Sequence, residues 1–226
     1  MPRGVVLCLA IFGAVLAAGC GGADDGDEQQ ERPLSVQERL LPPEEIPGFE
    51  RKKTFDWPDA AAFVTEGIGP ALPRRNSDEA IDVMTEAGFV SGAAEVLSKG
   101  SDEHLIVMAL QFETPSGASD AVEWLHDQNL KPCIRVCAIA ISDLSVDEIP
   151  GAKGARRVVT EQRPDASAAD LPPHDRYLIE FADGSFMYVV ERASPYTTSE
   201  EGDEDDALGA AQKVYDRVKG APAAGE

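Results

Sequence analysis

The stretch that decides the fold is "RYLIEFADGSFMYVVER", residues 176–192. Two arms rich in apolar residues flank Asp183 and Gly184, and an Asp-Gly pair in this setting is a strong signal of a two-residue β-hairpin turn. Such a turn would pair Phe181 with Phe186 and place the aromatic side chains on one face, toward the core. The charged residues would then lie on the opposite face, nearer water. The stretch therefore predicts an antiparallel hairpin in a sheet.

The rest of the chain supplies further hairpin strands and separate helices. Apolar periodicity and capping residues predict helices within residues 35–41, 57–68, 76–88, 116–129 and 203–220, and strands within 93–112, 137–142 and 155–162. Because the strands come in hairpins without a strand–helix–strand rhythm, we expect an α+β fold. In this fold an antiparallel sheet built from hairpins carries helices packed mainly on one face.

A short repeat raises the question of an internal duplication. "EIPG" occurs at residues 45–48 and 148–151, each time followed by a basic cluster and later by a hairpin and a helix. Two readings stay open: a pseudo-repeat of a strand–strand–helix unit, or coincidence in loops rich in proline and glycine.

The N-terminal residues have the pattern of an export signal. Arg3 is followed by an unbroken apolar run from Val5 to Ala18, which is too short to span a bilayer comfortably. Residues 1–19 are therefore interpreted as a signal peptide. Ala17 and Gly19 would also suit an ordinary signal peptidase, so plain secretion stays open.

The stretch "LAAGC", which ends at Cys20, resembles the lipobox of bacterial lipoproteins. This resemblance implies that Cys20 carries lipid, including a palmitate-type chain, and becomes the mature N-terminus. The protein would then be anchored to the cell membrane and face the extracytoplasmic side. The order of elements also resembles that of small uncharacterised extracytoplasmic lipoproteins of high-GC Gram-positive bacteria.

Composition divides the remainder into a tether, one domain and a tail. Residues 20–34 are polar and acidic and predict a disordered tether behind the lipidated cysteine. Residues 35–220 are long enough for a single α+β domain, and residues 221–226 form a disordered tail. Without residues 1–19 the chain has 41 acidic against 19 basic residues, a net charge of −22. Such a charge disfavours nucleic acid as a partner.

Two of the four cysteines fall inside the predicted domain. Cys133 and Cys137 form an even pair in an exported protein, which predicts a disulfide. Their spacing allows a bridge if the segment is coiled rather than extended, because only a coil brings the Cα atoms within reach.

No catalytic motif is present in the sequence. The three histidines, His104, His126 and His174, are scattered, and neither a metal site nor a cofactor is predicted. Trp57 and Trp124 are candidate residues for binding a partner, because Trp124 lies off the apolar stripe of its own helix. The basic residues 51–53 and 156–157 stand out in an acidic chain and could attract an acidic partner.

The leading hypothesis is a lipid-anchored extracytoplasmic domain that binds an unknown protein or small ligand without catalysis. One alternative is a cell-envelope hydrolase with a site that is not visible in the sequence. Another is a structural or spacer lipoprotein.

Overall fold

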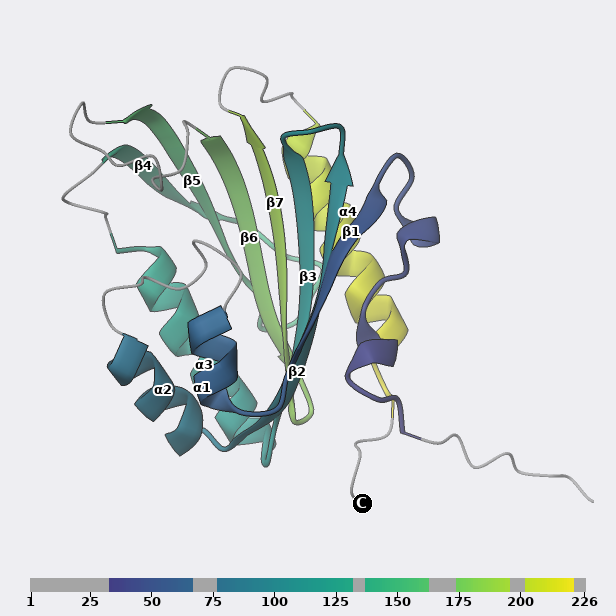
Figure 1. The fold of residues 1–226 in the computed structure, drawn as a ribbon, viewed down its shortest axis with the longest axis vertical. Helices are drawn as coiled ribbons and strands as arrows, with labels where there is room; N and C mark the ends of the chain where they lie inside the picture. The colour runs from purple at the N-terminus through teal and green to yellow at the C-terminus, as the bar shows by residue number, and fades with distance from the viewer. Residues whose placement is uncertain (1–32, 67–76, 132–136, 163–173, 196–201, 222–226) are drawn as a thin grey trace, which may run out of the picture. The chain divides into compact units, whose positions relative to one another are not determined.

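The computed structural model describes residues 33–66, 77–131, 137–162, 174–195 and 202–221. The described residues belong to one compact unit, Arg32–Glu226. Its centre is a seven-stranded antiparallel sheet with the order β1-β2-β3-β7-β6-β5-β4 (Figure 1). The strands are β1 (Glu50–Trp57), β2 (Phe89–Lys99), β3 (Glu103–Phe112), β4 (Cys137–Leu144), β5 (Lys153–Gln162), β6 (His174–Asp183) and β7 (Phe186–Pro195).

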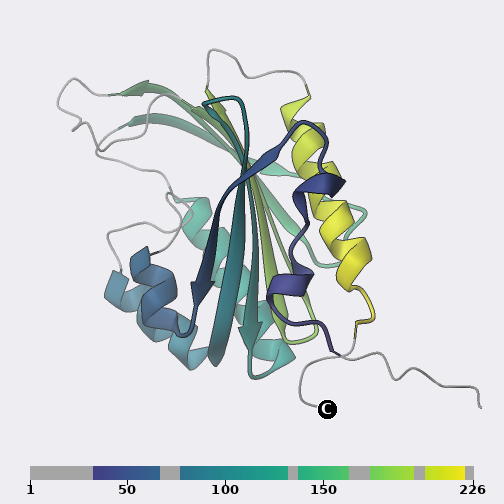
Figure 2. The ribbon, with the colours of Figure 1, turned by 45° about the vertical axis from the view of Figure 1, so that its right-hand side comes forward.

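Helices cover both faces of this sheet (Figures 1 and 2). One face carries α1 (Ala60–Glu66), α2 (Ser77–Glu86) and α3 (Pro115–Asn129). The other carries α4 (Asp203–Val218) and the short 3-10 helices η1 (Gln37–Arg39) and η2 (Pro43–Glu45). The predicted α+β fold is confirmed, and three of the four described α-helices share one face, with α4 on the other.

The ends of the helices follow from local hydrogen bonding and charge. Thr114 precedes α3, and its hydroxyl accepts a hydrogen bond from the N–H of Gly117 at 3.1 Å. The first turn of α4 holds four acidic residues, which the positive end of the helix dipole stabilises. Ser35 and Glu38 bond each other at the start of η1, so the predicted helix there is present as a single 3-10 turn.

The β6–β7 hairpin differs from its prediction by two residues. Its loop consists of Gly184, with φ 56°, and Ser185, while Asp183 stays in the strand and pairs with Phe186. Phe181 consequently pairs with Tyr188 rather than with Phe186, and the predicted partners are wrong. Because side chains alternate with a period of two, the shift leaves every residue on its expected face.

The expectation that the charged face of this hairpin lies nearer water is also wrong. Arg176, Glu180 and Glu191 are each 2 % exposed or less. The α3 side of the sheet buries these residues, and Arg176 forms an ion pair with Glu191. Both faces of the hairpin are therefore core, which suits its place in the middle of the sheet.

The two EIPG sequences form the same turn. The carbonyl of Ile46 accepts a hydrogen bond from the N–H three residues later at 3.2 Å, and that of Ile149 does so at 3.1 Å. The glycines that follow, Gly48 and Gly151, have φ of 85° and 71°, as a type II turn with proline at its second position requires. The two turns lead into β1 and β5.

The strands that follow the two turns, β1–β3 and β5–β7, have corresponding positions on the two sides of the β3–β7 pair. Ile106 pairs with Glu191 where the two halves meet, and on either side of this pair β3 continues into β2 and β1, while β7 continues into β6 and β5. One of the rows of paired residues that cross all seven strands contains this pair: Lys53, Val96, Ile106, Glu191, Leu178, Ala155 and Asp143. The sheet therefore has a pseudo-twofold relation in which β1 corresponds to β5, which favours the pseudo-repeat over coincidence.

Candidate functional site

The edge strand β1 lies at one end of the sheet (Figure 2). Glu50 to Thr54 are exposed, and β2 pairs with one side of the strand. Among the described residues no strand pairs with the other side, so its backbone N–H and C=O groups are available there. The sequence did not predict β1, because its charged residues give no apolar alternation.

A cavity of about 370 Å³ lies at the end of this edge. It is lined by Ser35, Val36, Gln37, Asp56, Trp57, Pro58, Ser91, Gly92 and Gln111. The Gln37 amide donates to Asp56 at 2.8 Å, and the Ser91 hydroxyl donates to Gln111 at 3.3 Å. None of these described lining residues is a lysine or an arginine, so the cavity suits neutral or cationic groups that bring hydrogen-bond donors.

The two tryptophans have different environments. Trp57, 1 % exposed, lies at the cavity and packs edge-on against Phe63. Its indole Nε1 is buried and has no hydrogen-bond partner among the described residues. Trp124 is half-buried on α3 and packs against the same core cluster. The structure thus places Trp57, but not Trp124, in the cavity lining.

The basic residues of β1 give this edge a charge opposite to that of the whole chain. Arg51 forms an ion pair with Glu95 at 2.7 Å, and the ammonium of Lys53 lies 3.9 Å from the ring centre of Phe55. Lys52 is the extra residue of a β-bulge. All three basic side chains are exposed, in a chain of net charge −21.

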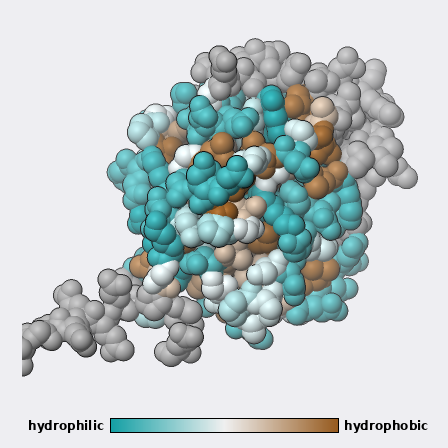
Figure 3. Space-filling view, turned by 180° about the vertical axis from the view of Figure 1, so that it is seen from behind, coloured by the Kyte–Doolittle hydropathy of each residue, from teal (hydrophilic) through white to brown (hydrophobic). Residues whose placement is uncertain are grey.

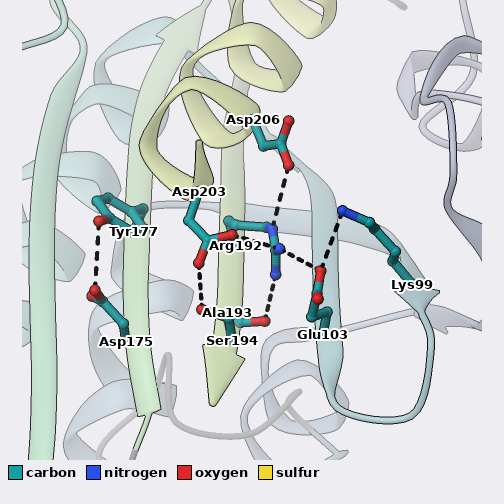
Figure 4. A network of polar contacts seen from close by, with 9 residues as sticks. All are labelled: Lys99, Glu103, Asp175, Tyr177, Arg192, Ala193, Ser194, Asp203 and Asp206. Carbon is teal, nitrogen blue, oxygen red and sulfur yellow. Dashed lines mark hydrogen bonds and ion pairs between the residues drawn. The ribbon is translucent and has the colours of Figure 1, made fainter. Parts of the chain in front are cut away.

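A second polar cluster fixes α4 to the sheet (Figure 4). Arg192, 1 % exposed, forms ion pairs at 2.7 Å with Glu103 of β3 and with Asp203 of α4. Ser194 donates to the same Asp203 at 2.6 Å. Because one cation joins carboxylates from a strand and a helix, this cluster explains the placement of α4 without any ligand.

The surroundings of two histidines shift their pKa values in opposite directions. His126 Nδ1 is 3.2 Å from Glu180, which also accepts a hydrogen bond from Asn129, and the hydrogen bond to Glu180 raises the pKa of His126. Burial and then the charge of Lys52 lower the pKa of His104. In the described part of the chain no cluster of three or more His, Cys, Asp or Glu side chains could hold a metal ion.

The surface on the α4 side is mainly hydrophilic, with hydrophobic residues in small separate areas (Figure 3). Within the described ranges, Val90, at 42 %, is the one large hydrophobic side chain that is strongly exposed. The described residues therefore offer no broad apolar patch for a partner. The β1 edge with its cavity is the better candidate for a binding site.

The structure does not test the predicted lipid site at Cys20 or the predicted Cys133–Cys137 disulfide. Cys20 and Cys133 lie outside the described residues, while Cys137 is the first residue of β4. The Cys133–Cys137 disulfide stays a prediction, which mass spectrometry of unreduced peptides would test. No described helix is long and apolar enough to cross a membrane.

Comparison with known proteins shows similarity of structure but not of sequence. No protein-family model and no curated protein sequence matches the chain. The extracellular domain of PknH from Mycobacterium tuberculosis matches with a TM-score of 0.50 and 12% identity, over 82% of this chain and 99% of that one. The Rv0999 ortholog from Mycobacterium smegmatis matches with a TM-score of 0.42 and 14% identity, over 76% and 90%. The chain therefore shares its α+β fold with the extracellular domain of PknH.

Proposed function

We propose that the protein is a lipid-anchored, non-catalytic binding domain on the extracytoplasmic side of a cell membrane. The apolar run up to Ala18 and the lipobox-like sequence at Cys20 support the anchor and the location. The PknH domain with the similar fold is extracellular, which fits the same side of the membrane.

The observation that carries the binding role is the cavity at the β1 edge. It combines a carboxylate, amides and hydroxyls next to a strand whose outer backbone groups are unpaired among the described residues. Groups of this kind can hold a ligand by hydrogen bonds. His126 bonds to the buried Glu180 and is not among the residues that line the cavity.

The anchor is tested by the Cys20→Ala substitution and by intact mass. We expect the wild-type mature chain to begin at Cys20 with the mass of added acyl chains, and the variant to be unprocessed or released. A wild-type mature chain that begins beyond Cys20 and carries no lipid would contradict the anchor.

The binding role is tested by fluorine NMR on the full mature chain labelled with fluorotryptophan. The chain has two tryptophans, so Trp124 is an internal control for Trp57. The probes are small amides, sugars and primary amines. We expect some of them to shift the Trp57 signal and leave the Trp124 signal in place. If no probe shifts Trp57, the spacer alternative is favoured.

A further inference from the structure

The two halves of the sheet, β1–β3 and β5–β7, differ at their outer edges. In the second half, β4 pairs antiparallel with the outer side of β5, next to the basic residues Arg156 and Arg157. In the first half, the matching side of β1 has no strand among the described residues. The chain ahead of β1, residues 33–49, instead packs on the α4 face, where Leu40 and Leu41 are buried. The edge of β1 is therefore an unfilled copy of a position that β4 fills.

The register shows what a strand at this position would meet. In the row of paired residues described above, Lys53 of β1 corresponds to Ala155 of β5. Asp143 of β4 pairs with Ala155. Two rows further, on the same face, Phe55 pairs with Ala94 in the first half. The matching row of the second half ends with Ile141 of β4. An added strand would thus carry its counterpart of Asp143 beside Lys53 and its counterpart of Ile141 beside Phe55.

The chemistry of β1 favours the same two residue types. The ammonium of Lys53 is exposed and attracts a carboxylate. The ring of Phe55 is half-buried and gains from contact with an apolar side chain. The three basic residues at 51–53 repel a strand of like charge, which selects against cationic partners.

We propose that β1 binds an extended segment of another polypeptide by antiparallel strand addition, and that this segment carries an apolar residue followed two positions later by an acidic one. The main-chain hydrogen bonds supply affinity, and the apolar–acidic pair supplies register and selectivity. This inference rests on the proposed binding role and gives it a partner class.

The test uses the full mature chain in detergent and a peptide with the sequence of residues 138–144 that carries a fluorescent label at its N-terminus and an amide at its C-terminus. Fluorescence anisotropy should show saturable binding. Lys53→Glu should weaken it about three- to thirty-fold, since an exposed ion pair is replaced by a like-charge pair. A peptide with lysine in place of its aspartate should recover binding to that variant. Lys219→Glu, at an exposed residue on the C-terminal side of α4, is the matched control and should change affinity less than about two-fold.

Two N-methylated peptides test the backbone contacts. One carries methyl groups on alternate amides, and the other carries them on the remaining amides. Because a strand pairs through alternate residues only, one peptide should lose binding and the other should keep it. If both bind equally, strand addition is wrong.

Three further outcomes would overturn the inference. Inorganic polyphosphate that competes as well as the peptide would indicate a general anion site. Dimerisation that Lys53→Glu abolishes would make a second copy of the chain the partner. Absence of peptide binding, together with ligand shifts at Trp57, would remove the inference but leave the proposed function standing. Melting temperatures of both variants would show that each is folded.

Discussion

Gly92→Ala probes the packing in the wall of the cavity, where Gly92 of β2 lies next to Trp57. A Cβ atom built at Gly92 lies 2.7 Å from Leu110 Cδ2 and 3.0 Å from Trp57 Cε3. Ordinary carbon contacts are about 3.5–4.0 Å, so these side chains must move by about 0.5–1 Å. Overpacking of this kind costs about 1–3 kcal/mol, and replacing a strand glycine returns about 0.5–1 kcal/mol. We expect a net loss of about 0–2.5 kcal/mol in the free energy of unfolding.

Urea denaturation measures this loss, and Gly209→Ala is the matched control. Gly209 lies inside α4, and a Cβ atom added there would meet nothing within 4 Å, so alanine at this position should stabilise the protein by about 0.8–1 kcal/mol. The fluorine signal of Trp57 should shift in Gly92→Ala and stay in place in Gly209→Ala. A Gly92→Ala variant as stable as the wild type, with an unchanged Trp57 signal, would refute the packing described for the cavity wall.

Three further predictions concern the framework of the domain. Arg192→Met should cost about 3–5 kcal/mol in urea denaturation, because it leaves the buried carboxylate of Asp203 without that cation. His126→Gln should lower stability most at acidic pH, because the pKa of His126 is raised in the folded state. The stability that this raised pKa contributes is complete below the ordinary value of 6.5 and is lost as pH rises through the folded-state pKa. Gly184→Val and Gly100→Val should each cost about 1–3 kcal/mol in thermal melts, because both glycines have positive φ, of 56° and 70°.

Each of these predictions has an outcome that would contradict it. Lys219→Met removes an exposed ion pair and should change stability by less than about 1 kcal/mol, so an equal loss in Arg192→Met would mean that burial of the cluster is unimportant. A stability difference for His126→Gln that grows with pH would reverse the sign of the argument. A harmless Gly184→Val would mean that the β6–β7 loop differs from Gly184–Ser185.

The fold could be predicted from the sequence because its central elements have strong local signals. The β6–β7 arms alternate clearly, and α2, α3 and α4 have periodic apolar residues. The exact partners in the hairpin could not be predicted, since Asp183-Gly184 and Gly184-Ser185 are both acceptable loops. A shift of two residues keeps the faces, so the burial pattern does not distinguish them.

The candidate site was only partly accessible from the sequence. Trp57 was identified, but β1 was not, because an edge strand with exposed Glu50 to Thr54 lacks the alternation of a half-buried strand. The cavity brings together residues from separate parts of the chain, so no local pattern indicates it. The EIPG repeat was the signal that could have located β1, because the same turn precedes β5, which was predicted as a strand.

Hydrogen exchange of the full mature chain, with and without the peptide of residues 138–144, tests the central claim most directly. The claim is that the outer side of β1 is the binding edge. We predict that saturating peptide slows exchange at backbone amides within Glu50–Trp57 and leaves α4 and β5 unchanged. Slowed exchange along α4 or β5, with β1 unaffected, would contradict the claim.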